Sequence, residues 1–122
     1  MMNIETALKE AMAIDGATGA ALVDYGSGMS LGTIGGGRGL DLEVAAAGNT
    51  EVVRAKLRTM SSLAINDEIE DILITLSGQY HIIRLLKTAG GQLFLYLVLD
   101  RERSNLALAR HNLRNIERQM TL

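Results

Sequence analysis

Hydrophobic residues follow two different periods along this chain, and these periods divide it into predicted helices and strands. The most hydrophobic segment has seven consecutive apolar or aromatic residues between Gln92 and Asp100. That length is typical of a strand, because buried helices usually need ten or more residues. Both faces of the segment are apolar, whereas a strand with one face in water alternates polar and apolar side chains. The pattern therefore predicts a central strand in a sheet that is covered on both sides.

Three other segments repeat their apolar residues at the helical spacing of three or four positions. They cover residues 3–14, 42–64 and 104–120. Asn3, Asp41 and Ser104 lie at the starts of these segments and are suitable N-cap residues, because their side chains can accept hydrogen bonds from the first turn. We expect three helices.

The remaining apolar runs are short and predict strands at 17–25, 29–34, 72–77, 80–87 and 92–100. Turns are expected at 26–28, 77–79 and 88–91, so that the last three strands form an antiparallel meander. Acidic residues lead into the strand at 72–77, and such charges suit the edge of a sheet. The predicted fold is α+β: a five-stranded antiparallel sheet with helices on both faces, in the order αββαβββα, as in profilin-like folds.

The middle helix has more uncharged surface than one contact with a sheet requires. Its uncharged arc is roughly 220° wide, against the roughly 100° needed for one such contact. One part of this arc suits the core, and the adjacent part is rich in small residues: Ala45, Gly48, Val52, Ala55, Thr59 and Leu63. Small residues let two helices approach closely, so we expect a second partner, either the same helix of another copy or another helix of the same chain.

Composition and charge limit the possible functions. The 122 residues are enough for one domain, 1–122, with its own core, and the sequence contains no cysteine. A net charge of −2 does not favour binding to nucleic acid. The sequence has no apolar run of the roughly 20 residues needed for membrane insertion, and its beginning does not resemble a signal peptide. We therefore expect a cytoplasmic location.

No arrangement of residues predicts an enzyme, a metal site or a cofactor site. The glycine-rich segment 26–39 lacks the lysine and hydroxyl residues of a phosphate-binding loop, and we interpret its end, 35–39, as a flexible loop. His81 falls in a predicted strand and His111 on the polar side of the last helix, without a second histidine at metal-binding spacing. The acidic segment 67–71 does not match a calcium-binding loop.

The order of elements and several short motifs resemble the Roadblock/dynein light-chain family. The motifs are Ile14-Asp-Gly-Ala-Thr-Gly-Ala-Ala-Leu-Val-Asp24, Gly28 in the first hairpin, and Asn105-Leu-Ala-Leu-Ala-Arg110 at the start of the last helix. The resemblance implies a non-catalytic homodimer that binds and regulates or scaffolds a Ras-like small GTPase. The chain is similar to bacterial members of this family. Some of these act with a histidine-kinase-like sensor in membrane-associated modules, so the resemblance also implies recruitment to a membrane through partners.

The resemblance also assigns expected roles to residues. The dimer interface would contain the small-residue arc of the middle helix and the strand at 69–76, including Ile72 and Ile74. We expect the GTPase on the outer side of the same helix, at Glu43, Glu51, Arg54 and Arg58. Arg38 in the glycine loop is a candidate arginine finger.

The alternative function is a small-ligand sensor of the PAS, GAF or profilin-like type. It would need a pocket with converging polar groups, whereas most candidate lining residues are the Leu, Ile and Ala that the core requires.

Overall fold

A computed structural model describes residues 2–87 and 91–120, which form three α-helices, five strands and a short 3-10 helix. The elements in chain order are α1 (Ile4–Met12), β1 (Ala17–Asp24), β2 (Met29–Gly35), α2 (Leu42–Ser62), β3 (Asp71–Thr75), β4 (Gln79–Leu85), β5 (Leu93–Asp100), the 3-10 helix η1 (Arg101–Arg103) and α3 (Leu106–Gln119). The predicted order of helices and strands is confirmed.

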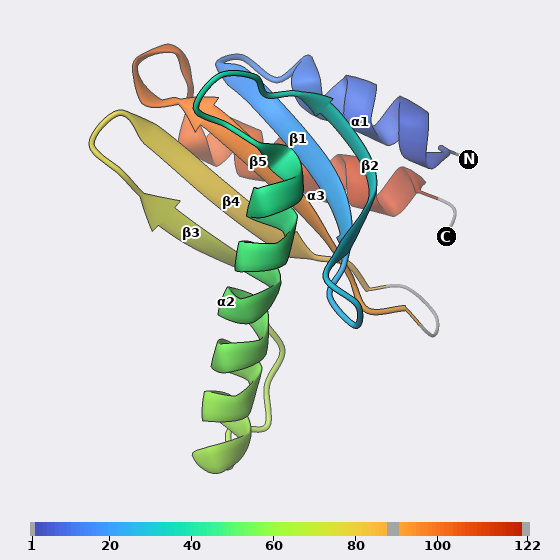
Figure 1. The fold of residues 1–122 in the computed structure, drawn as a ribbon, viewed down its shortest axis with the longest axis vertical. Helices are drawn as coiled ribbons and strands as arrows, with labels where there is room; N and C mark the ends of the chain where they lie inside the picture. The colour runs from blue at the N-terminus through green and yellow to red at the C-terminus, as the bar shows by residue number, and fades with distance from the viewer. Residues whose placement is uncertain (1, 88–90, 121–122) are drawn as a thin grey trace.

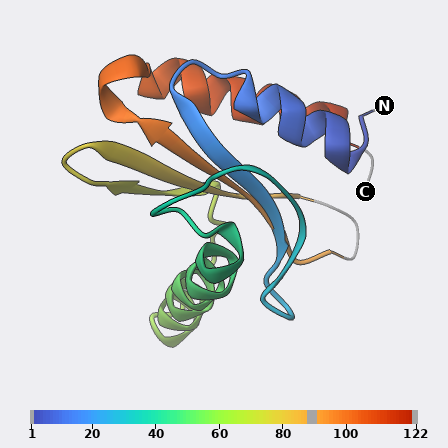
Figure 2. The same ribbon diagram turned by 45° about the horizontal axis from the view of Figure 1, so that its top comes forward.

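The strands form one antiparallel sheet in the order β2-β1-β5-β4-β3. Helices α1 and α3 cover one face of this sheet and α2 lies on the other, which gives three layers (Figures 1 and 2). The central strand β5 is buried on both faces: Leu95, Leu97 and Leu99 pack toward α1 and α3, and Phe94, Tyr96 and Val98 pack toward α2. The expectation drawn from the apolar run at 92–100 is confirmed.

Some element boundaries differ from the prediction. Helix α3 is capped by Asn105, which accepts a hydrogen bond from the Leu108 amide at 3.0 Å, and not by Ser104. The residues before it form η1 because the Asp100 carboxylate accepts a hydrogen bond from the Glu102 amide. Strand β3 ends at Thr75, since the Leu76 amide already donates to the Gln79 carbonyl across the turn. The predicted turn at 88–91 lies outside the described residues except for Gly91.

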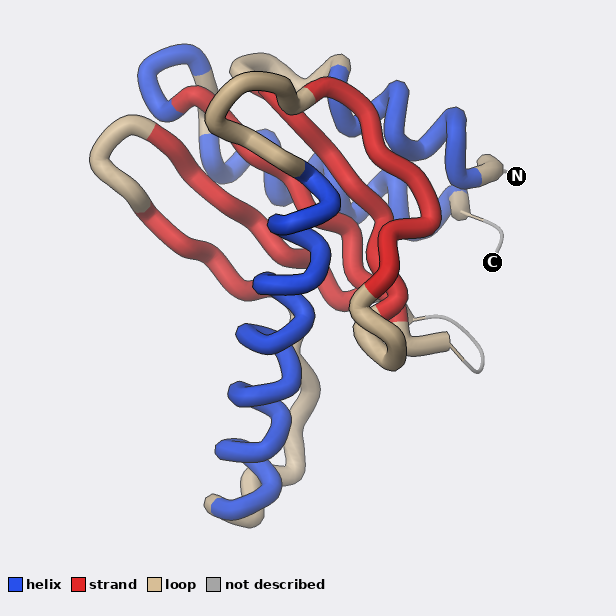
Figure 3. The backbone as a smooth tube through the Cα atoms, in the orientation of Figure 1, coloured by secondary structure: helices blue, strands red, loops and turns tan. Residues whose placement is uncertain are grey.

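Helix α2 is longer than the sheet beneath it. Its 21 residues correspond to a length of about 31 Å, and its C-terminal part extends beyond the strands (Figure 1). The chain then returns alongside the helix to reach β3 (Figure 3). In this projecting part Met60 is buried, whereas Arg58, Thr59, Ser61 and Ser62 are exposed.

Candidate interaction surface

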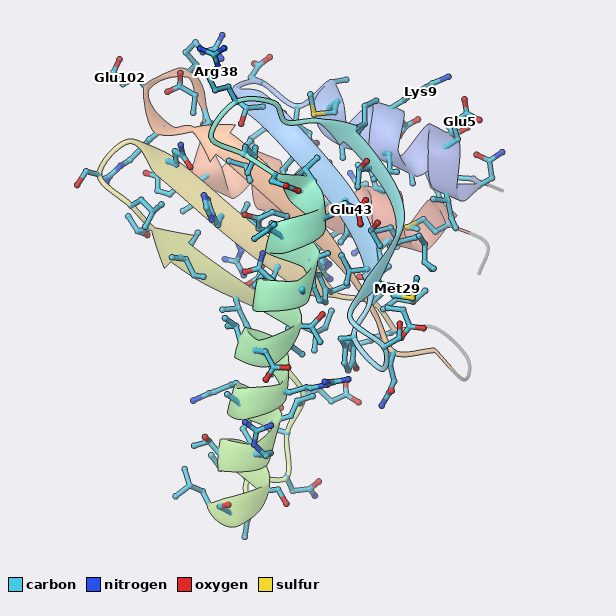
Figure 4. The ribbon with its side chains drawn as sticks, in the orientation of Figure 1. Glu5, Lys9, Met29, Arg38, Glu43 and Glu102 are labelled. Carbon is cyan, nitrogen blue, oxygen red and sulfur yellow. The ribbon has the colours of Figure 1, made fainter. Side chains whose placement is uncertain are left out.

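The start of α2 is fixed by polar contacts to the cap and to β2. Asp41 caps the helix by accepting hydrogen bonds from the amides of Glu43 at 3.0 Å and Val44 at 3.2 Å, as predicted. The Glu43 carboxylate accepts a hydrogen bond of 2.8 Å from the Ser30 hydroxyl of β2, and its side chain lies between the two elements (Figure 4). Glu43 therefore faces the β1–β2 hairpin.

Arg54 holds the middle of α2 to the same hairpin. Its guanidinium donates to the Tyr25 carbonyl at 3.0 Å and to the Gly26 carbonyl at 2.6 Å. It also lies 3.5 Å from the exposed Glu51 carboxylate. The sequence did not indicate these contacts, because the hairpin lies 28 residues away and presents only backbone carbonyls.

The side of α2 that faces the sheet is the one expected from its apolar spacing. Leu42, Ala46 and Val53 are buried there, and Leu57 packs against the same cluster. Met60 is also buried, but it lies in the projecting part of the helix and outside this cluster. The buried residue that the prediction missed is Thr50, whose hydroxyl donates to the Ala46 carbonyl one turn earlier at 2.8 Å. A local bond of this kind satisfies a buried hydroxyl without a partner from the sheet.

The small-residue arc lies mostly in solvent within this protomer. Gly48, Ala55 and Thr59 are exposed, Val52 is 38% exposed and Leu63 is 64% exposed. Ala45 is half-buried at the edge of the core. A side chain added at Gly48 would meet no other atom within 4 Å. Over the part of the chain that the structure describes, most of this arc is uncovered, and its predicted place in a dimer interface stays a prediction.

Strand β3 forms one edge of the sheet, as the acidic residues before it predicted. Ile72 and Ile74 are half-buried and pack toward the α2 side, while Leu73, on the opposite face, is 38% exposed. The strand is anchored at its start by Asp71, which accepts hydrogen bonds from Arg110 of α3 at 2.7 and 3.1 Å. These hydrogen bonds and the charge of Asp71 raise the pKa of Arg110. Contacts with α2 on one face and with α3 on the other therefore hold β3 in place.

The glycine segment before α2 is a defined turn and not an irregular loop. Gly37 and Leu40 exchange backbone hydrogen bonds of 3.1 and 3.0 Å, with Arg38 and Gly39 between them. Gly39 has φ +84°, a conformation that favours glycine. Arg38 is exposed and projects from this turn away from the sheet (Figure 4).

The predicted partner-binding residues do not converge on one point. Glu51 and Arg58 lie on the exposed side of α2, whereas Glu43 and Arg54 lean toward the hairpin. Glu43 and Arg58 are separated by about 22 Å along the helix axis. Together these residues form an elongated surface along α2, and Arg38 stands beyond its first turn.

A hollow of about 720 Å³ lies between α2 and the segment that leads into β3. Its lining residues are Val52, Lys56, Asp67, Glu68, Ile69, Glu70, Asp71, Ile72 and Lys87. Ligand pockets are lined mainly by apolar and aromatic side chains, whereas most of these residues are charged. The hollow does not favour a small-ligand sensor.

No group of three or more His, Asp or Glu side chains in residues 2–87 and 91–120 is arranged to hold a metal ion. No described helix combines the length and the apolar character needed to cross a bilayer.

Comparison of the sequence with family models and with curated proteins gives no match. Comparison of the structure gives several. A Roadblock/LC7 domain from Streptomyces avermitilis is similar with a TM-score of 0.77 and 14% identity, over 96% of this chain and 93% of that chain. Myxococcus xanthus MglB is similar with a TM-score of 0.73 and 17% identity, over 92% and 83% of the two chains. MglC from the same organism has a TM-score of 0.61 and 20% identity, over 97% and 96%.

These similarities extend over nearly the whole chain, and they agree with the order of elements and the sheet topology described above. At identities of 14–20% they establish the architecture. The resemblance expected from the sequence is thus confirmed in the fold, and the chain has the Roadblock/LC7 fold.

Proposed function

We propose that this protein is a non-catalytic homodimeric module that binds a Ras-like small GTPase and regulates or scaffolds it. The observation that carries the proposal is the second uncharged face of α2, which is exposed and rich in small residues although the helix already packs on the sheet through another face. The Roadblock/LC7 fold supports it, since the resemblance to that family implies a dimer and a GTPase partner. The proposed site of action is the cytoplasm, with any contact with a membrane made through partners.

The proposed dimer packs two α2 helices against each other in antiparallel orientation. With a two-fold axis at the middle of the helix, Gly48 lies opposite the partner's Thr59 and Val52 opposite the partner's Ala55. Each larger side chain then faces a smaller one, which allows close packing. The free edge of β3, with Ile72 and Ile74, would extend the contact by pairing with the same strand of the second copy.

The proposed GTPase surface is the charged side of α2 that this dimer leaves exposed. Glu51 and Arg58 are available there, and Glu43 and Arg54 keep the helix in place on the hairpin while exposing part of their side chains. Arg38 is the only arginine that we propose as an arginine finger. If Arg38→Ala leaves stimulated GTP hydrolysis unchanged, Arg38 has no such role, and any stimulation comes from the GTPase's own residues.

The dimer is tested by light scattering at micromolar concentration, which should give twice the chain mass of 13.1 kDa. A monomer would contradict the proposal and favour the sensor function. Among the structures compared, one is described as MglB with a tetrameric arrangement, so a larger assembly built from dimers is compatible with it.

The partner is tested by calorimetry with a purified Ras-like small GTPase, in its GDP and GTP forms. Reversing two charges with Glu51→Lys and Arg58→Glu should weaken binding at least tenfold, because charge pairs across an interface contribute to affinity. The matched control is Glu5→Lys on α1, which lies on the opposite side of the sheet (Figure 4). Equal binding by all variants would rule out this surface. None of the structures compared points to the histidine-kinase-like sensor, and the proposal does not include it.

A further inference from the structure

The turn between β1 and β2 lies beside the middle of α2 (Figures 1 and 2). Asp24 closes this turn: its carbonyl accepts a hydrogen bond of 2.7 Å from the Gly28 amide, and its carboxylate accepts one of 2.8 Å from the Gly26 amide. The Tyr25 amide donates to the Gln92 carbonyl, just before β5, at 2.8 Å. Hydrogen bonds within the sheet and the turn therefore define the shape of the turn.

Arg54 fastens this turn to the helix through backbone carbonyls. Its Nε donates to the Tyr25 carbonyl at 3.0 Å, and its Nη2 donates to the Gly26 carbonyl at 2.6 Å. The remaining nitrogen, Nη1, lies 3.5 Å from the Glu51 carboxylate. Each nitrogen of this guanidinium thus has a partner within the chain. Arg58, one helical turn further along, forms no ion pair among residues 2–87 and 91–120, so it can pair with a carboxylate of a partner while Arg54 stays with the turn.

The charged side of α2 is too small to be the whole contact with a GTPase. From Glu43 to Arg58 it is about 22 Å long, and a helix is about 10 Å wide, which gives a projected area of about 220 Å². A stable protein interface takes about 800 Å² from each partner. A GTPase bound to this side must therefore also cover a neighbouring element. On one flank lies the small-residue arc, which the proposed dimer uses, and on the other lies the β1–β2 hairpin.

We propose that Arg54 is a positioning residue for the GTPase: it holds the β1–β2 turn beside α2, so that the turn and the charged side of the helix form one contact surface. This inference rests on the function proposed above. The turn contributes Gly26 and Ser27, which are exposed. They lie close to Glu51 and Arg58, because Arg54 stands within one helical turn of both.

The loss of Arg54 should weaken binding without removing a direct contact. The turn then loses the two hydrogen bonds that fasten it to α2, and its tip no longer keeps a fixed distance from the helix. A GTPase must order the turn when it binds, and this ordering reduces affinity.

Calorimetry with a purified Ras-like small GTPase compares Arg54→Met with Arg58→Met. Both variants remove one positive charge from the same side of α2, so their effects on long-range attraction are matched. Each should weaken binding by about tenfold or more, Arg58→Met through a lost contact and Arg54→Met through the turn. Arg54→Lys keeps the charge but cannot bind both carbonyls in the same way, so it should also weaken binding, and it replaces Arg54→Met if that variant does not fold.

A disulfide between the turn and α2 separates the two causes. A Cβ on Gly28 would lie 4.0 Å from Cβ of Thr50, within the range of about 3.5–4.5 Å found in disulfides, and the chain has no cysteine of its own. Gly28→Cys combined with Thr50→Cys should, when oxidised, restore most of the affinity of Arg54→Met and of Arg54→Lys. It should not restore Arg58→Met. Because Gly28 has φ +82°, where a cysteine is strained, each oxidised protein is compared with its own reduced form.

Amide hydrogen exchange of residues 25–28 measures the position of the turn without the GTPase. Exchange should be faster in Arg54→Met than in Arg58→Met, and the disulfide should slow it again. Unchanged exchange in Arg54→Met would overturn the inference, and so would a disulfide that restores the affinity of both variants or of neither.

The calorimetry also separates this inference from the proposed function. If the unmodified protein does not bind the GTPase, the proposed function is wrong and this inference is wrong with it. If the unmodified protein and Arg54→Met bind equally well, only the positioning role of Arg54 is contradicted.

Discussion

The substitution Gly48→Lys should leave the protomer folded but prevent its association into the proposed dimer. Gly48 lies inside α2 in open space, with no atom within 4 Å of an added Cβ. Lysine forms helices better than glycine by roughly 0.5–1 kcal/mol, and Glu51 lies three residues further on, where it can pair with the new charge. The protomer should therefore be slightly more stable than before.

The same substitution should prevent the proposed dimer. Gly48 would lie against the partner's α2, where a lysine has neither space nor a buried counter-charge. An unpaired charge or a polar group without a partner at a close helix contact is unfavourable by several kcal/mol, and every 1.4 kcal/mol corresponds to a tenfold change in affinity. The dissociation constant should rise by at least about a hundredfold.

Three measurements compare Gly48→Lys with Gly48→Ala as the matched control. Light scattering at micromolar concentration should give one chain mass, 13.1 kDa, for the lysine variant and two for the alanine variant. Circular dichroism should give the same helix content for both. Urea unfolding of the lysine variant should be followed at concentrations where it is monomeric. A dimeric Gly48→Lys protein would refute this use of the α2 face, and a destabilised monomer would show that Gly48 is needed within the protomer.

Three further substitutions test the fold that positions this surface, each by urea unfolding. The Arg84 side chain is 9% exposed and lies 2.8 Å from the Glu117 carboxylate. Glu117→Leu removes its counter-charge and should lower the free energy of unfolding by about 3 kcal/mol, and Arg84→Met combined with Glu117→Leu should recover most of this loss. Additive losses in the double variant would contradict the reasoning. Ala64→Gly should stabilise by about 0.5–1 kcal/mol, because Ala64, directly after the C-cap residue Leu63 of α2, has φ +56°. A loss would mean that its methyl group has a packing role. Arg54→Met should destabilise by about 1–2 kcal/mol through the two hydrogen bonds it removes from the β1–β2 turn, and no change would show that water replaces the guanidinium there.

The sequence by itself predicted the fold and the buried side of α2. Apolar spacing specifies which residues face a core, and this is why the central place of β5 agrees with expectation. The edge position of β3 was predicted from its acidic residues and the Asp41 cap from the type of its side chain, and both also agree. Ser104 was wrong as a cap because Asn105 is equally suitable, and only the η1 turn decides between them.

Only the tertiary structure showed which polar side chains meet. The contacts of Arg54 with the hairpin, of Asp71 with Arg110, and of Tyr96 with His81 join residues 15 to 39 positions apart. The spacing of residues along one helix or strand carries no information about such pairs, because they depend on how separate elements are stacked. The sequence determined that α2 has a second uncharged face; the packing of the other helices on the opposite side of the sheet decided that this face stays open.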